Sequence, residues 1–163
     1  MTTMMTREER RARTLDDPRF ERYRNPRSRR VLAGGMLATL LAEGVLIALT
    51  DTDLPYWAVL AGIAAVIVAG VFFLGALKAS TRGLEELSEG VLDERQAQLR
   101  GQVYVDAYRW GSGLFVAGLA TVALWLLLDW PAPGTGTVLA ALVVSFHAAI
   151  ALPTLVAALR AEV

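Results

Sequence analysis

The sequence predicts an all-α integral membrane protein, a four-helix bundle built from two antiparallel transmembrane hairpins. Three observations support this fold class. Hydrophobic residues make up 55% of the 163 residues and charged residues 20%, and the mean hydropathy is +0.44. A soluble domain of average composition is about 45–50% apolar and about 25% charged. The apolar residues are gathered in four long blocks, and every basic residue lies outside those blocks.

Each of the four blocks is long enough to cross a bilayer. They span about residues 31–50, 55–77, 110–128 and 137–159. A hydrocarbon core about 30 Å thick requires about 20 apolar residues in a helix. Lipid offers the backbone no hydrogen-bond partner, so each block is expected to be helical. The chain therefore divides into a basic N-terminal tail, residues 1–30, and a transmembrane domain, residues 31–163.

The connections between the blocks differ in length. Residues 51–55 and 129–136 are short and rich in turn-forming residues, so each is expected to join antiparallel neighbours. Residues 78–109 form a much longer polar connector. Its apolar residues recur at helical spacing, which predicts short helical extensions of the second and third spans. Gly83 and Gly90 are the expected break points.

The distribution of basic residues predicts the orientation in the membrane. All sixteen lie in the tail, in the connector or at Arg160, and the two short loops contain none. Cytoplasmic segments carry an excess of arginine and lysine. Both termini and the connector are therefore expected on the cytoplasmic side, and the two short loops on the outer side.

The N-terminal tail is strongly basic next to the first span. Residues 1–30 hold ten arginines and five acidic residues. Near an anionic leaflet each basic residue contributes about 1 kcal/mol to attraction. One interpretation is contact with anionic lipid headgroups, or docking of a partner; the other is a topology signal alone. Nucleic acid is not an expected partner, because acidic residues are interspersed and no binding motif is present. The candidate headgroup contacts are Arg22, Arg24, Arg27, Arg29 and Arg30.

The connector contains a short charged motif at residues 93–96. Asp93 and Gln96 have the spacing of a capping box, with Asp93 as the N-cap. Glu94 would then lie in the first turn, where the helix dipole favours an anion. This interpretation makes the motif the start of the helix that becomes the third span. The alternative is a phosphate-binding or catalytic role for Asp93, Glu94 and Arg95.

This motif carries a resemblance. The residues LDERQ at 92–96, followed by AYR at 107–109, resemble the connector of uncharacterised small four-helix multi-pass membrane proteins of high-GC Gram-positive bacteria. In those proteins such a stretch lies between two membrane hairpins. The resemblance implies a location in a bacterial cytoplasmic membrane and the same topology, and it implies no chemistry.

Two ionisable residues lie inside the predicted spans, Glu43 in the first and His147 in the fourth. At 1.5 Å per residue, Glu43 lies about 18 Å from the inner end of its span, and His147 about 15 Å from the outer end of its own. The two are therefore at similar depth and can form a pair. Such a pair can carry a proton or bind a cation. The alternative is a neutral hydrogen bond that only holds helices together.

The first span carries a second resemblance. The residues GGMLATLLAE at 34–43 are similar to the first helix of small multidrug resistance exporters, which carries an essential membrane glutamate. The likeness covers this helix alone. The long connector and the basic tail depart from that compact family, and its other helix motifs are absent.

The sequence contains no motif that is typical of an enzyme. No nucleophile–base pair, phosphate loop or metal motif is present, and the chain has no cysteine and one histidine. We therefore expect no catalytic activity, no cofactor and no metal. The first hypothesis for function is an interaction or regulatory membrane subunit that uses the connector and the tail to contact a protein partner or another copy. The alternative is a small proton- or cation-coupled transporter that uses Glu43 and His147.

Overall fold

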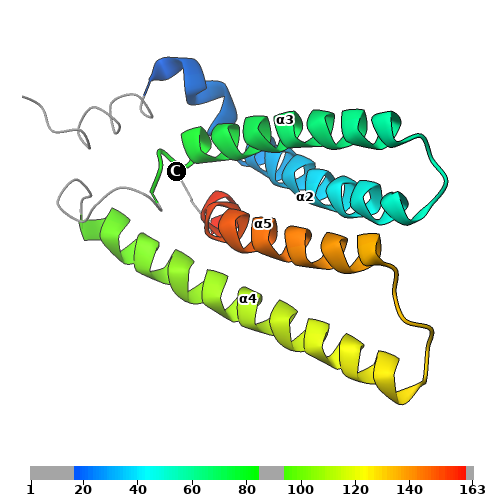
Figure 1. The fold of residues 1–163 in the computed structure, drawn as a ribbon. Helices are drawn as coiled ribbons and strands as arrows, with labels where there is room; N and C mark the ends of the chain where they lie inside the picture. The colour runs from blue at the N-terminus through cyan, green and yellow to red at the C-terminus, as the bar shows by residue number, and fades with distance from the viewer. Residues whose placement is uncertain (1–16, 85–93, 161–163) are drawn as a thin grey trace, which may run out of the picture.

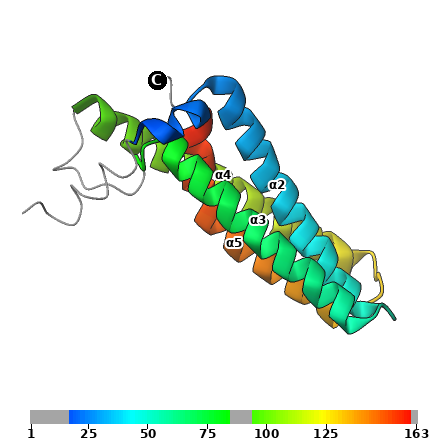
Figure 2. The ribbon, with the colours of Figure 1, turned by 90° about the horizontal axis from the view of Figure 1, so that it is seen from above.

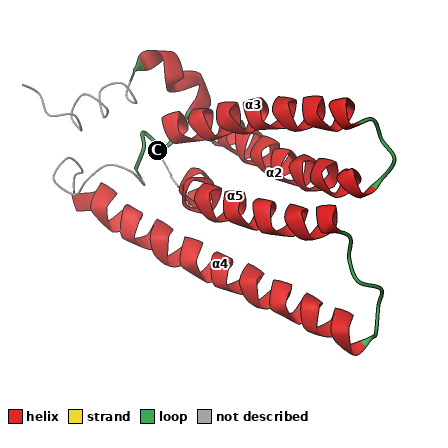
Figure 3. Ribbon diagram, viewed as in Figure 1, coloured by secondary structure: helices red, strands yellow, loops and turns green. Residues whose placement is uncertain are grey.

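The computed structural model describes residues 17–84 and 94–160, and these residues are helical apart from short connections (Figures 1 and 3). Four helices are long and apolar enough to cross a membrane, as the sequence predicts. The elements in chain order are the 3₁₀ helix η1 (Pro18–Tyr23), α2 (Pro26–Ala48), the 3₁₀ helix η2 (Leu49–Asp51), α3 (Tyr56–Ser80), α4 (Glu94–Leu127) and α5 (Thr135–Arg160).

The first spanning helix begins earlier than its apolar block predicts. Helix α2 begins at Pro26 rather than near residue 31. The Asn25 side chain accepts a hydrogen bond from the Ser28 backbone N–H at 2.9 Å, and proline is favoured at the first helical position. The prediction that residues 1–30 form a tail separate from the helix is therefore wrong for its last residues, which form the first turns of α2.

Helix α3 ends close to the predicted end of its span. It stops at Ser80, and the backbone then turns through Arg82 (φ 56°) and Gly83 (φ 66°). The Gly83 N–H donates to the Lys78 carbonyl at 2.8 Å, which closes the last turn of the helix. The predicted break at Gly83 is confirmed, and within the described residues α3 does not continue beyond Ser80. The other predicted break, at Gly90, lies outside the described residues.

The second half of the connector continues into the third span. Helix α4 runs without interruption from Glu94 to Leu127, a length of 34 residues, or about 51 Å at 1.5 Å per residue. The predicted helical extension of the third span is thus confirmed. It is a single long helix, polar over its first half and apolar over its second.

The four long helices do not share one core. Helices α2, α3 and α5 run alongside one another (Figures 1 and 2), and their buried apolar side chains form one cluster. The expected four-helix bundle is therefore a three-helix unit with α4 attached to it. The cluster contains Leu32, Ala33, Met36 and Leu40 of α2, Ala76 and Leu77 of α3, and Ala151, Leu155 and Ala158 of α5.

Helix α4 attaches to α5 through its polar first half. Val103 and Ala107 are buried against Val156 and Ala157 of α5. None of the residues in the most apolar stretch of α4 is buried. The most apolar part of this helix is therefore not covered by the other described residues.

A carboxylate ties the two helical hairpins together at the ends of their short loops. Asp51 of η2 accepts hydrogen bonds from the backbone N–H groups of Gly136 at 2.7 Å and Thr137 at 3.0 Å. These groups lie in the first turn of α5, so Asp51 caps that helix from a distant part of the chain. A Cβ at position 136 would lie 2.8 Å from the Ile47 carbonyl oxygen, and this close approach requires glycine.

Candidate functional site

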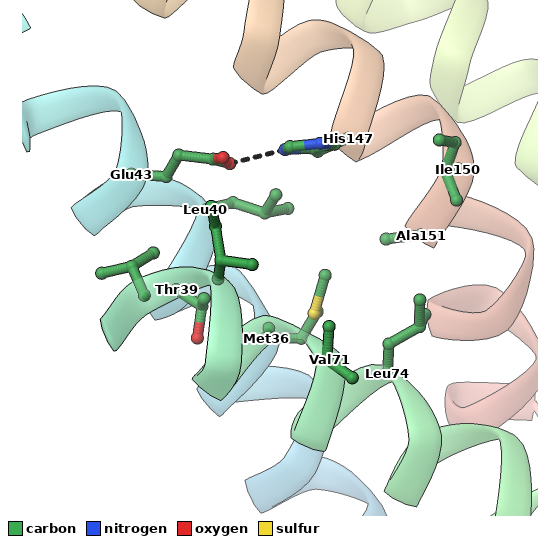
Figure 4. Close-up of a pocket in the computed structure, with 12 residues that line it drawn as sticks. Met36, Thr39, Leu40, Glu43, Val71, Leu74, His147, Ile150 and Ala151 are labelled. Carbon is green, nitrogen blue, oxygen red and sulfur yellow. Dashed lines mark hydrogen bonds and ion pairs between the residues drawn. The ribbon is translucent and has the colours of Figure 1, made fainter. Parts of the chain in front are cut away.

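The structure brings Glu43 and His147 into direct contact. His147 Nδ1 lies 2.8 Å from Glu43 Oε2, and the two residues are 104 positions apart in the sequence (Figure 4). Glu43 lies on α2 and His147 on α5. The matching depths inferred from the sequence thus correspond to one hydrogen bond between the first and last spanning helices.

The backbones of α2 and α5 approach closely beside this pair. A Cβ at Gly44 would lie 3.1 Å from Val144 Cγ2, which is tighter than an ordinary contact. Glycine at this position lets α5 pack against α2 one residue after Glu43. Such close packing of small residues is a common basis of helix association in membranes, and it places the carboxyl within reach of the imidazole.

The two side chains differ in their exposure. The side chain of Glu43 is 7% exposed, and that of His147 is 41% exposed. The carboxyl is therefore enclosed by protein, whereas one side of the imidazole remains accessible. An enclosed carboxyl needs a partner, because leaving a polar group unsatisfied away from water costs roughly 1–3 kcal/mol. His147 supplies that partner.

The pair lies at one end of an apolar cavity of about 260 Å³ between α2, α3 and α5 (Figure 4). The cavity extends along α2 from Met36 to Glu43, a rise of about 10 Å. Besides the pair, the one hydroxyl in its lining is Thr39, whose Oγ1 donates to the Gly35 carbonyl at 2.8 Å within the same helix. Glu43 and His147 are thus the titratable groups that line this cavity.

The hydrogen bond permits two arrangements of one proton. Either a protonated Glu43 donates to His147 Nδ1, or a protonated Nδ1 donates to the Glu43 carboxylate. A neutral acid beside a neutral imidazole and a carboxylate beside an imidazolium have the same net charge, zero. Removing one proton from either arrangement leaves a net charge of −1. The pair can therefore exchange one unit of charge while its hydrogen bond is kept.

The arginines near the start of α2 are not equally accessible. Arg22, Arg27 and Arg30 are exposed and Arg24 is half-buried. Arg29 is 2% exposed, so its guanidinium lies within the protein rather than at the surface. Headgroup contact stays a prediction for the other four. Arg22 lies over the Tyr23 ring, with its guanidinium carbon 4.7 Å from the ring centre.

The connector motif is described only in part. Asp93 lies outside the described residues, so its predicted role as an N-cap stays a prediction. Glu94 is the first residue of α4, the position that the capping interpretation gives it. Arg95 is exposed and Gln96 is half-buried. The phosphate-binding or catalytic alternative for this motif also stays a prediction.

Sequence reasoning missed two polar contacts that link distant segments. One is the Asp51 cap on α5. The other is Asp106 of α4, whose carboxylate forms ion pairs with Arg160 of α5 and, at 3.9 Å, with Arg109. The Asp106–Arg109 spacing of three residues was a visible signal, since such residues are neighbours on a helix. The contact with Arg160 had no signal in the sequence.

No protein-family model, curated protein or solved structure matches this chain. Within residues 17–84 and 94–160, no group of three or more histidine, aspartate or glutamate side chains is placed to hold a metal ion.

Proposed function

We propose that the chain is a four-span membrane protein with both termini and the segment between α3 and α4 on the cytoplasmic side. The distribution of charge supports this orientation, because all sixteen basic residues lie outside the two short loops. The location we propose is a bacterial cytoplasmic membrane.

We further propose that this protein is a small proton- or cation-coupled transporter whose exchange site is the Glu43–His147 pair. The contact between an enclosed carboxyl and an imidazole carries this proposal, since it lies beside an apolar cavity between three helices that are long and apolar enough to cross a membrane. Ionisable residues within spans are costly and usually serve ion or proton pathways.

The coupling follows from the net charge of the pair. With its proton the pair is neutral, and without it the charge is −1. An uncompensated charge near the centre of a membrane helix costs about 2.5–3.5 kcal/mol on insertion scales. A monovalent cation that replaces the proton restores neutrality. The pair with a bound proton or a bound cation is therefore favoured over the pair with neither. Proton and cation thus compete for Glu43, and a fall in pH weakens cation binding.

Flux in proteoliposomes tests this function. The full chain is reconstituted with a pH-sensitive dye inside the vesicles, and a gradient of Na⁺ or K⁺ is imposed. The wild type is expected to move protons against the cation, and Glu43→Gln is expected to reduce this flux to the level of empty vesicles. Thr39→Val is the matched control: it lies one turn away on the same cavity, and its hydroxyl is engaged within α2. Equal flux in Glu43→Gln and wild type contradicts the proposal.

A second candidate function is a non-enzymatic interaction or regulatory subunit. The observation that favours it is the spanning half of α4, which has no buried residue. Among the described residues, the buried side chains of α4 lie in its first half, so its apolar faces are available to a partner subunit or a second copy. The basic segment before α2 and the connector would then contact the same partner on the cytoplasmic side.

Photocrosslinking in cells distinguishes this candidate. A photoreactive residue replaces Val116 of α4, which is 63% exposed, or Val68 of α3, which is 70% exposed. A partner on α4 gives a discrete protein adduct at position 116 and none at position 68. Lipid adducts alone at both positions contradict a partner on α4.

A further inference from the structure

A polar cavity that is open to solvent lies along the inner half of α4, beside the last turn of α5. Its volume is about 510 Å³, and it is separate from the cavity beside Glu43. Its polar lining consists of two guanidinium groups, two amides and one carboxylate. These belong to Arg109, Arg160, Gln98, Gln102 and Asp106.

One carboxylate holds the two guanidinium groups together. Asp106 Oδ2 pairs with Arg160, and Asp106 Oδ1 lies 3.9 Å from an Arg109 nitrogen. The Asp106 side chain is 14% exposed, whereas those of Arg109 and Arg160 are 77% and 47% exposed. Each carboxylate oxygen is thus turned toward an arginine. The three groups together carry a net charge of +1, and all three line the cavity.

Arg109 and Arg160 lie at the same depth in the proposed membrane, each at the end of an apolar stretch. Arg109 directly precedes the apolar part of α4, which begins at Trp110, and Arg160 follows the apolar part of α5. Tyr108 and Trp110 are 78% and 66% exposed beside them. Aromatic rings of this kind favour the headgroup level of a bilayer. The end of the cavity lined by Arg109 and Arg160 therefore lies where phosphate groups of the inner leaflet would be.

Apolar surface continues outward from the cavity. The spanning half of α4 has no buried residue, and a Cβ at Gly111 would lie 3.4 Å from Leu152 of α5. Acyl chains have a surface to contact there, directly beyond the charged groups. A free phosphate would use the arginines and leave this apolar surface unused.

We propose that this cavity binds one anionic phospholipid, with its phosphate held by Arg109 and Arg160, the rest of its headgroup directed toward Gln102, and its acyl chains lying along α4. Arginine suits this role because its planar fork donates two parallel hydrogen bonds to a phosphate. The inference rests on the cytoplasmic placement proposed above. Cysteine labelling in spheroplasts tests that placement without measuring lipid binding, so the placement and the lipid site can be contradicted independently.

Native mass spectrometry of the full chain in detergent tests the lipid site, with phosphatidylglycerol and phosphatidylcholine as probes. We expect one phosphatidylglycerol per protomer to be retained in preference to phosphatidylcholine. Arg109→Gln should weaken its binding about fivefold, and adding Arg160→Gln roughly twentyfold in all. Arg109→Gln is the decisive variant if Arg160→Gln disturbs the packing of α4, because the Arg109 side chain is largely exposed.

Arg19→Gln is the matched control. It removes the same charge from a side chain of η1 that is 90% exposed and is not among the candidate headgroup contacts, and we expect it to change binding by less than about twofold if the site is specific. An equal loss in Arg19→Gln and Arg109→Gln overturns the proposal, as does equal binding of phosphatidylcholine. Displacement of the lipid by millimolar inorganic phosphate would contradict a lipid ligand and indicate a site for a free anion.

Discussion

At the scale of residues, Glu43 and His147 depend on each other unequally. Glu43 is the enclosed partner, and His147 is the one with an accessible side. Removing the imidazole leaves an enclosed carboxyl without its partner, whereas an amide in place of the carboxyl can still bond to Nδ1 at the same distance. The consequence for stability is therefore different for the two sides of the same hydrogen bond.

We predict that His147→Ala destabilises the protein by roughly 1–3 kcal/mol, the cost of an unsatisfied buried polar group. Glu43→Gln should cost less than about 1 kcal/mol, since membrane hydrogen bonds average about 0.6 kcal/mol. Thermal unfolding of both variants in one detergent measures the difference. If Glu43→Gln lost more stability than His147→Ala, the carboxyl itself would stabilise the fold, and its hydrogen bond with His147 would not be the main contribution.

At the scale of elements, helix α5 depends on a residue outside it for its first turn. Asp51 accepts two backbone hydrogen bonds from that turn. We predict that Asp51→Ala lowers the Tm by a few degrees, because two N–H groups lose their partner and the two hairpins lose a contact. Asp53→Ala, in the same loop, is the control and should leave the Tm unchanged. Equal shifts in both variants would assign the effect to loop charge instead.

Helix α4 behaves as two halves with different surroundings. Val103 is 0% exposed against α5, whereas Val116 is 63% exposed in the spanning half. We predict that Val103→Ala costs roughly 1–2 kcal/mol through lost burial, and that Val116→Ala costs less than about 0.5 kcal/mol. Denaturant unfolding of the two variants compares them directly. A large cost for Val116→Ala would mean that the outer half is buried by an additional contact.

At the scale of the whole molecule, the proposed topology makes each polar segment accessible from one side only. The chain has no cysteine, so single cysteines can be introduced without background. We predict that a membrane-impermeant maleimide labels Thr52→Cys in intact spheroplasts, and labels Gln98→Cys only after lysis. The reverse pattern contradicts the cytoplasmic placement of the connector.

Much of this architecture follows from the sequence because a bilayer imposes strong constraints. Four apolar blocks predict four helices, and counting residues from the ends of the spans places Glu43 and His147 at similar depth. The start of α2 at Pro26 was missed because arginines interrupt the apolar pattern, although Asn25 and Pro26 carry a capping signal. The separation of α4 from the three-helix core has no such signal, since lipid-facing and protein-facing surfaces of a spanning helix are both apolar.

The contacts that join distant segments could not be predicted from the sequence either. Asp51 at the start of α5 and Arg160 beside Asp106 each depend on how the two hairpins are placed relative to one another. Charge counts in loops identify the side of the membrane, but they do not identify partners across the structure. Pairing at similar depth was predictable for Glu43 and His147 because the spans contain no other ionisable residue.

Exchange of a proton for a cation at Glu43 is tested most directly by measuring proton release when cation is added. The purified chain is placed in weakly buffered detergent solution, and Na⁺ or K⁺ is added while a pH-sensitive dye is followed. The proposed site predicts up to one proton released per wild-type protomer and none from Glu43→Gln. No release from the wild type, or the same release from Glu43→Gln, would contradict exchange at this pair and leave it a packing contact between α2 and α5.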